Sequence, residues 1–134
     1  MEEVDSKKLA CVIARVLDDK LANNITILNI SSVSSLGDYF VIASADSPTQ
    51  VKSLMMSVKE MIKKHFGRSP VRMENDLKNR WNLLDYGDVI VHILHRDERE
   101  TYAIEKFWNH AFSIPEEIWM AESEGYSEYK GIGE

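Results

Sequence analysis

Cysteine is nearly absent from this chain, whose 134 residues include a single one, Cys11. One cysteine cannot build an internal disulfide framework, and such a chain suits a reducing compartment. Long hydrophobic runs are also lacking, because no stretch approaches the roughly 20 apolar residues of a membrane span. The start, Met-Glu-Glu-Val-Asp, has neither the basic residues nor the apolar stretch of a secretory signal. We therefore expect a cytoplasmic protein with no membrane partner.

The chain has fewer basic residues than acidic ones. The chain carries 16 Lys and Arg against 22 Asp and Glu, a net charge of −6. Proteins that bind nucleic acid by neutralising phosphates collect Lys and Arg on one surface, so we expect no direct DNA binding. The best basic cluster is Lys59, Lys63 and Lys64 near one helix end. A solvated helix face, placed favourably in the helix dipole, explains this cluster more simply than a phosphate site.

The patterns of catalytic and metal sites are missing as well. The chain has no Asp-x-Asp pair, no Gly-Ser sequence and no glycine motif of the Walker or Rossmann type. At the predicted strands, only Glu74 and Asp76 are carboxylates spaced to share a face, and a solvated sheet edge explains them better than a metal site. His92 and His95 are three positions apart on a predicted strand, which places them on opposite faces. We therefore expect no enzyme activity and no cofactor or metal.

The chain does contain helical patterns. Apolar residues at helical spacing predict a first helix from about Ser6 to Leu21, with Asp5 or Ser6 as its cap and Asn23-Asn24 at its end. A second helix should follow the capping sequence Ser47-Pro48-Thr49-Gln50. A short third helix is expected with Asp97 as its cap.

Strand patterns alternate with these helices. They are predicted at residues 25–30, 39–45 and near 71–74, and the segment from Trp81 to His95 should form two more. The strand at 39–45 is apolar throughout, so we expect it to be central. Alternating strands and helices predict an α/β fold, a single domain with a mixed β-sheet and helices packed on it.

The segment from Trp81 to His95 is the most informative one. It predicts two strands joined by a tight turn, in which Gly87 is free to adopt a positive φ. The second strand, Val89 to Leu94, is an almost continuous apolar run, typical of a central strand buried on both faces. The first strand carries aromatic and aliphatic side chains beside charged residues. It is therefore the better candidate for a contact surface.

Here the chain also resembles a known family. The string Leu84-Asp85-Tyr86-Gly87-Asp88-Val89-Ile90-Val91-His92 resembles the signature of the ribosomal silencing factors, RsfS, also called Iojap. Further matches occur in the same order: upstream Asp38-Tyr39-Phe40-Val41-Ile42-Ala43-Ser44, Ser47 and Gln50-Val51, and downstream Arg99, Tyr102 and Glu105-Lys106-Phe107-Trp108. The resemblance covers roughly residues 5–112. It implies a nucleotidyltransferase-like topology without the catalytic carboxylates.

The resemblance also implies a function. Such proteins bind ribosomal protein L-fourteen on the free large ribosomal subunit, sterically block joining of the small subunit, and repress translation when nutrients are short. An acidic chain suits a basic ribosomal protein, because complementary charge speeds and orients the encounter. Two alternatives remain: a large-subunit assembly factor that does not silence, and a nucleotide-binding enzyme remnant, for which fold alone is a weak argument.

The residues expected to bind the partner match the family motif and its surroundings. They are Trp81, Leu83, Leu84, Asp85, Tyr86 and Glu74. Strand alternation places Trp81 with Leu83 on one face and Leu84 with Tyr86 on the other, so one pair can be core, and the sequence does not say which. Asp85 can equally well shape the turn. An exposed apolar strand also invites pairing with a copy of itself, so a homodimer through the Trp81 surface is a further candidate.

The chain departs from the family pattern in two places beside this strand. Asn75 follows Glu74 where relatives often have Gly, and Asn82 replaces a residue that is usually apolar. The acidic region after Pro115 lies largely outside the resemblance. We therefore predict an RsfS-like domain over residues 1–112 and an acidic C-terminal extension over 113–134, which is the candidate for partial disorder.

Overall fold

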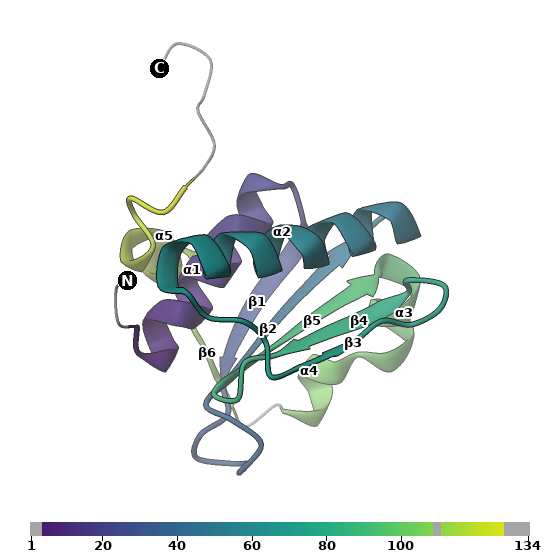
Figure 1. Ribbon diagram of the computed structural model, residues 1–134. Helices are drawn as coiled ribbons and strands as arrows, with labels where there is room; N and C mark the ends of the chain where they lie inside the picture. The colour runs from purple at the N-terminus through teal and green to yellow at the C-terminus, as the bar shows by residue number, and fades with distance from the viewer. Residues whose placement is uncertain (1–3, 109–110, 128–134) are drawn as a thin grey trace.

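One six-stranded sheet organises the chain. The structure is a computed structural model that describes residues 4–108 and 111–127 (Figure 1). The strands lie in the order β3-β4-β5-β2-β1-β6, and β2 and β5 run parallel while the other neighbours are antiparallel. The elements are α1 (Ser6–Asp19), β1 (Asn23–Asn29), β2 (Tyr39–Ala45), α2 (Pro48–Phe66), β3 (Arg72–Glu74), β4 (Trp81–Asp85), β5 (Val89–His95), α3 (Arg96–Tyr102), α4 (Ile104–Phe107), β6 (Phe112–Ser113) and α5 (Glu116–Glu122).

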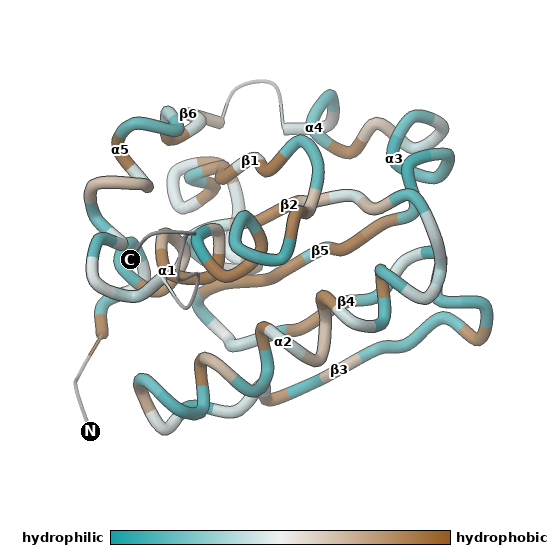
Figure 2. The backbone as a smooth tube through the Cα atoms, turned by 90° about the horizontal axis from the view of Figure 1, so that it is seen from above, coloured by the Kyte–Doolittle hydropathy of each residue, from teal (hydrophilic) through white to brown (hydrophobic). Residues whose placement is uncertain are grey.

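The helices divide between the two faces of this sheet. Helices α1 and α2 cover one face, with α5 beside α1, and the short helices α3 and α4 lie on the other (Figures 1 and 2). The larger apolar cluster fills the space between the sheet and α1 and α2. A smaller cluster lies on the opposite face, where Ile104 and Trp108 pack over Phe40 and Leu94. The prediction of a single α/β domain with a mixed sheet is confirmed.

The two central strands carry the most apolar sequences. Every residue of β2 and of β5 is buried, and the two strands pair in register from Tyr39 opposite Val89 to Ala45 opposite His95. Side chains on a strand alternate between the two faces, so a strand covered on both sides needs apolar residues at almost every position. Central positions for both strands are therefore confirmed.

The first helix is shorter than its apolar pattern suggests. Asp5 caps it as expected, because its carboxylate accepts a hydrogen bond from the Lys8 amide at 2.7 Å. The helix nevertheless ends at Asp19, and Leu21 follows with a φ of 65°. Asn23-Asn24 does not end the helix but opens β1. The backbone turns away at Leu21, where the sequence carries no signal for a left-handed residue.

The third helix is capped differently from the prediction. His95, not Asp97, is the N-cap, and its Nδ1 accepts a hydrogen bond from the Asp97 amide at 3.1 Å. The helix starts directly after β5, so the last strand residue also serves as the cap. Ala103, with a φ of 44°, then separates α3 from α4.

The C-terminal segment belongs to the same domain. Strand β6 pairs with β1, and Trp119 of α5 is almost fully buried against the larger cluster. Arg15 of α1 donates hydrogen bonds to the Met120 carbonyl at 2.6 Å and to the Ser123 hydroxyl at 3.0 Å. The boundary predicted after residue 112 therefore does not separate two units. The predicted disorder falls partly on residues 128–134, which lie outside the described residues.

Within residues 4–108 and 111–127, no helix is both long and apolar enough to cross a bilayer.

Candidate functional site

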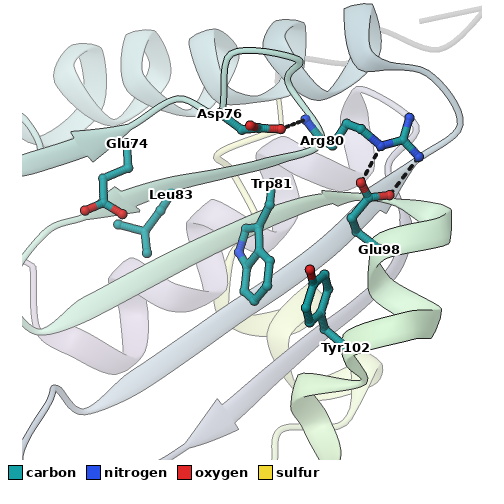
Figure 3. A pocket seen from close by; sticks show the side chains of 7 residues that line it. All are labelled: Glu74, Asp76, Arg80, Trp81, Leu83, Glu98 and Tyr102. Carbon is teal, nitrogen blue, oxygen red and sulfur yellow. Dashed lines mark hydrogen bonds and ion pairs between the residues drawn. The ribbon is translucent and has the colours of Figure 1, made fainter.

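The face of the sheet opposite α1 and α2 is only partly covered, and a pocket of about 400 Å³ opens there. Strands β3 and β4, the loop between them, and α3 supply its walls (Figure 3). The lining residues are Glu74, Asp76, Arg80, Trp81, Leu83, Glu98 and Tyr102. Three of them, Glu74, Trp81 and Leu83, belong to the predicted partner-binding set.

An aromatic pair forms one wall of the pocket. The rings of Trp81 and Tyr102 lie with their centroids 5.1 Å apart (Figure 3). Trp81 is half-buried, whereas Tyr102 is 53% exposed. Aromatic side chains that combine buried and accessible surface often act as binding anchors. The pair therefore offers a rigid apolar wall to an incoming group.

A hydrogen bond to the neighbouring strand orients the side chain of Trp81. Its indole Nε1 donates a hydrogen bond to Nδ1 of His92 on β5 at 3.2 Å. Burial lowers the pKa of His92 to about 4, so the imidazole is neutral at neutral pH and its Nδ1 can accept. His92 in turn contacts the ring of Phe40 edge-on, with centroids 4.8 Å apart. The indole is thus held by a strand that is itself fully buried.

Arg80 is held by acidic neighbours at one end of the pocket. Its guanidinium forms two hydrogen bonds to the Glu98 carboxylate, one of them at 2.8 Å and the other through Nε (Figure 3). Hydrogen bonding to Glu98 raises the pKa of Arg80. The backbone amide of Arg80 also donates to the Asp76 carboxylate at 3.0 Å. Three carboxylates and one guanidinium therefore line the pocket, which leaves its wall acidic.

Asn82 organises the loop above the pocket. This residue is fully buried, and its Oδ1 accepts from the Asp76 amide at 3.1 Å while its Nδ2 donates to Asn79 Oδ1 at 3.0 Å. Buried amides are stable in a core only when they are hydrogen-bonded. The polar residue that departs from the family pattern is therefore an anchor for the turn that carries Asp76 and Arg80.

Leu77, in the loop between β3 and β4, is not among the residues that the sequence analysis expects to bind a partner. Its side chain is 99% exposed. The signal was available, because Leu77 is the only apolar residue among the polar residues 75–80. Isolated exposed leucines are common. This one deserves a place in the site because the loop that carries it also supplies two pocket residues.

The other predicted residues lie elsewhere. Leu84 is 0% exposed and Tyr86 is 3% exposed, and both belong to the larger cluster under α1 and α2. Burial along β4 alternates, with Leu84 on the covered side and Trp81 and Leu83 on the side of the pocket. We therefore remove Leu84 and Tyr86 from the candidate contact surface, because neither side chain is accessible to a partner.

Asp85 shapes the turn between β4 and β5. Its carboxylate accepts from the Gly87 amide at 2.7 Å and lies 3.7 Å from Arg72. Gly87 has a φ of 92°, as the turn requires. Asp88, on the other side of the turn, pairs with Arg68 at 2.8 Å. Asp85 does not line the pocket, so its structural role is the one the geometry supports.

Strand pairing with a second copy of the chain is restricted. Strand β4 pairs with β5 along its whole length, and β3 pairs with Leu83, Leu84 and Asp85. Those three residues therefore offer no free edge to a second copy of the chain, whereas Trp81 and Asn82 have no partner in β3. Self-association through the Trp81 surface would have to use side chains or this short stretch of backbone.

Metal chemistry has little support here. Glu74 and Asp76 both line the pocket, but Glu74 pairs with Arg72 at 3.3 Å and Asp76 accepts from the Arg80 amide. The part of the chain that the structure describes holds no group of three or more His, Cys, Asp or Glu residues suited to a metal.

Comparison with known proteins shows which family this sequence matches. The model of the family "Ribosomal silencing factor during starvation" matches residues 3–130. Ribosomal silencing factor RsfS of Bacillus subtilis is 35% identical over 108 residues, which cover 81% of this chain and 91% of that protein. The mouse protein "Mitochondrial assembly of ribosomal large subunit protein 1" is 27% identical over 99 residues, 72% of this chain and 43% of that protein.

A solved structure agrees with this result. A crystal structure of a protein from Chromobacterium violaceum superposes with a TM-score of 0.75 at 31% identity, covering 79% of this chain and 88% of that one. The family match spans nearly all of the described residues, the segment after residue 112 included. The chain belongs to the ribosomal silencing factor family.

Proposed function

We propose that this protein represses translation in the cytoplasm by occupying the large ribosomal subunit and blocking the small subunit sterically. The pocket between β3, β4 and α3 is the proposed contact, and ribosomal protein L-fourteen is the proposed partner. The observation that carries the proposal is the combination in one pocket of an aromatic wall, Trp81 with Tyr102, and an excess of carboxylates.

The physical requirements are modest. A stable protein–protein interface buries about 1,600 Å² in total, and a few aromatic anchors near its centre supply most of the affinity. Trp81 is pre-oriented by His92, so little conformational freedom is lost when a partner packs against it. To block subunit joining, it is sufficient that the protein occupies a surface that the small subunit also needs. No chemical step is required.

The charge of the pocket favours a basic protein over RNA. Glu74, Asp76 and Glu98 line it. Glu98 largely balances the charge of Arg80, and Glu74 lies 3.3 Å from Arg72, so Asp76 carries the excess negative charge. Phosphate groups would be repelled by this wall, whereas Lys or Arg side chains of a ribosomal protein would be attracted.

A second function is favoured by one relative. The mouse protein is named for assembly of the mitochondrial large ribosomal subunit. An assembly factor would use the same contact but would bind immature particles in preference to mature free subunits. A nucleotide-binding remnant is the weakest alternative, and we expect no thermal stabilisation by millimolar ATP or CTP with Mg²⁺.

We also propose that self-association competes with binding to the large subunit. A homodimer that buries Trp81 through side-chain contacts would mask the pocket and lower the concentration of active monomer. Trp81→Ala should then weaken both associations. If the variant leaves both unchanged, Trp81 is a purely structural residue.

Sedimentation of ribosomal subunits tests the main proposal. Purified large subunits would be incubated with wild type, Trp81→Ala or Phe112→Ala, then mixed with small subunits and separated on sucrose gradients. Phe112 is the matched control, because it is an exposed aromatic residue on β6, at the other end of the sheet. Wild type and Phe112→Ala should co-sediment with large subunits and suppress joined ribosomes, whereas Trp81→Ala should do neither.

Other outcomes contradict the proposal. Binding of wild type without an effect on joining excludes steric silencing and favours the assembly role. Absence of binding to large subunits excludes both.

A further inference from the structure

The outward face of α2 carries a straight row of exposed side chains. Lys52, Met56, Lys59 and Lys63 are spaced by four, three and four residues, so they follow one line along the helix. All four are exposed, and Met56 is 46% exposed. At a rise of 1.5 Å per residue, the row spans about 16 Å. We call these four residues the α2 lysine row.

The charge of this row contrasts with the rest of the molecule. Helix α2 contains four lysines and one glutamate, although the whole chain has a net charge of −6. Among the residues that the structure describes, Lys52, Lys59 and Lys63 form no ion pair. The helix dipole explains a lysine in the last turn, such as Lys63, but not Lys52 in the first turns. Positive charge is thus concentrated on one face and left unpaired there.

A hollow of about 350 Å³ lies beside the row. Its lining residues are Met56, Lys59, Glu60, Lys63 and Ser69. Met56 provides apolar surface, and lysines in general can add their aliphatic stems to such a surface while their ammonium groups stay in water. Methionine adapts to differently shaped apolar groups, as in other docking surfaces. Two lysines and one glutamate, Glu60, line the hollow, and Lys52 adds a further positive charge along the row, so its surroundings are net positive. The hollow therefore fits one apolar side chain flanked by negative charge.

The face lies behind the proposed ribosome contact. Helix α2 packs on β4 and β5 from the side opposite to the pocket (Figure 1). If the pocket faces the large subunit, the α2 lysine row points away from it, and this step alone rests on the proposed function. The row then stays accessible while the pocket is occupied.

We infer that the α2 lysine row is a second docking surface, which binds an acidic segment of another protein. The segment would place one apolar side chain in the hollow beside Met56, and its carboxylates would pair with Lys52, Lys59 and Lys63. Two observations favour protein over RNA. The hollow suits an aliphatic side chain, and the row has no aromatic residue for base stacking and no arginine for bidentate phosphate contacts.

Fluorescence anisotropy with defined probes tests this inference. The main probe is a labelled peptide of about 14 residues, long enough to cover the row as a helix, with glutamates at the spacing of the lysines and one central leucine. Companion probes replace the leucine with serine or all glutamates with glutamine. A labelled oligouridine of similar length represents RNA. The protein is the full chain, at roughly 50 mM salt to limit screening.

Matched variants separate the row from charge in general. We expect saturable binding of the acidic leucine peptide and binding about tenfold weaker to Lys59→Gln/Lys63→Gln, from the loss of two ion pairs. Lys20→Gln/Lys78→Gln removes two exposed lysines elsewhere and should bind as wild type does. Met56→Ser should weaken binding of the leucine peptide but not of its serine companion. Trp81→Ala should leave all peptide binding unchanged.

Several outcomes would overturn the inference. Absence of saturable binding, or equal weakening by the two lysine pairs, identifies the row as a solvated helix face. Tighter binding of oligouridine that depends on Lys59 and Lys63 identifies an RNA surface instead. The result is independent of the ribosome contact, because the peptide assay contains no subunits. Conversely, failure of wild type to bind large subunits would refute the proposed function and leave the peptide result standing.

Discussion

The indole of Trp81 is hydrogen-bonded to His92 across two neighbouring strands, with Nε1 3.2 Å from Nδ1. This contact joins the proposed binding surface to β5, a strand whose residues are all buried. The acceptor is the imidazole of His92, which can be protonated. This hydrogen bond at the pocket therefore depends on pH.

Stability should depend on His92 at acidic pH. Burial lowers the pKa of His92 from 6.5 to about 4, so below pH 6.5 the unfolded chain binds a proton that the folded chain does not. The stabilising contribution is therefore complete above pH 6.5 and is lost as the pH falls toward 4, by roughly 2 kcal/mol at pH 4.5. Urea unfolding of wild type and His92→Gln at pH 7 and pH 4.5 measures the difference.

The His92→Gln variant controls for the contribution of carboxylates to the loss of stability at acidic pH. It keeps an acceptor for the Trp81 indole but does not titrate, while all other acid-sensitive groups remain. Wild type should lose more stability than His92→Gln over this range. An equal loss in both would show that carboxylates alone cause the acid sensitivity.

Replacing Asn82 by leucine should loosen the loop without unfolding the domain. Leucine makes this position apolar but removes the two hydrogen bonds to Asp76 and Asn79. The freed loop groups can reach water, so we expect a change in the free energy of unfolding within about 1.5 kcal/mol. Amide hydrogen exchange at Asp76 should become much faster, and binding to large subunits should weaken. Asn75→Ala, on the exposed side of the same loop, should leave that amide unchanged.

Leu77 should contribute to partner binding and not to stability. Its side chain is 99% exposed, so Leu77→Ser removes almost no packing in the free protein. Truncation of an anchor that a partner buries costs about 1–2 kcal/mol, a five- to thirtyfold weaker binding. Leu21→Ser provides the comparison, because Leu21 is 78% exposed in the turn between α1 and β1 and does not line the pocket. Equal affinities of the two variants for large subunits would remove Leu77 from the site.

Charge at the pocket should act mainly on the association rate. Glu74 is exposed and lines the pocket, so Glu74→Lys reverses one charge where a basic partner approaches. We expect slower association with large subunits at low salt, and the difference from wild type should shrink as salt is raised. Surface-plasmon resonance at two salt concentrations measures both rates. Glu124→Lys makes the same change in net charge on an exposed residue outside the pocket, and an equal effect would point to overall charge alone.

The positions of strands were easiest to predict from the sequence where a strand is buried on both faces of the sheet. Continuous apolar runs identified β2 and β5 as central strands, because a strand covered on both faces has few places for polar residues. Strand β4 was harder. Alternation separates Trp81 and Leu83 from Leu84 and Tyr86, but it does not say which face the helices cover. That choice depends on where α2 packs, a contact between residues distant in the chain.

Details of the site depended on tertiary contacts of the same kind. Asn82 looks out of place in a strand until its bonds to the 75–80 loop are seen. Tyr102 reaches the ring of Trp81 only because α3 starts directly after His95 and packs against β5 and β2. Leu77 was visible as an apolar residue in a polar loop, but neither its exposure nor its proximity to pocket residues can be read from spacing.

The packing of α5 against α1 has a consequence for synthesis on the ribosome. The earliest helix of the domain receives its Arg15 contacts and the cover of Trp119 only from residues near the end of the described chain. While the chain is still being made, α1 therefore lacks part of its final packing, and β1 lacks the neighbour that β6 provides. The complete domain can form only after this late segment has left the exit tunnel. Until then, a nascent copy carries an α1 whose apolar surface is only partly covered.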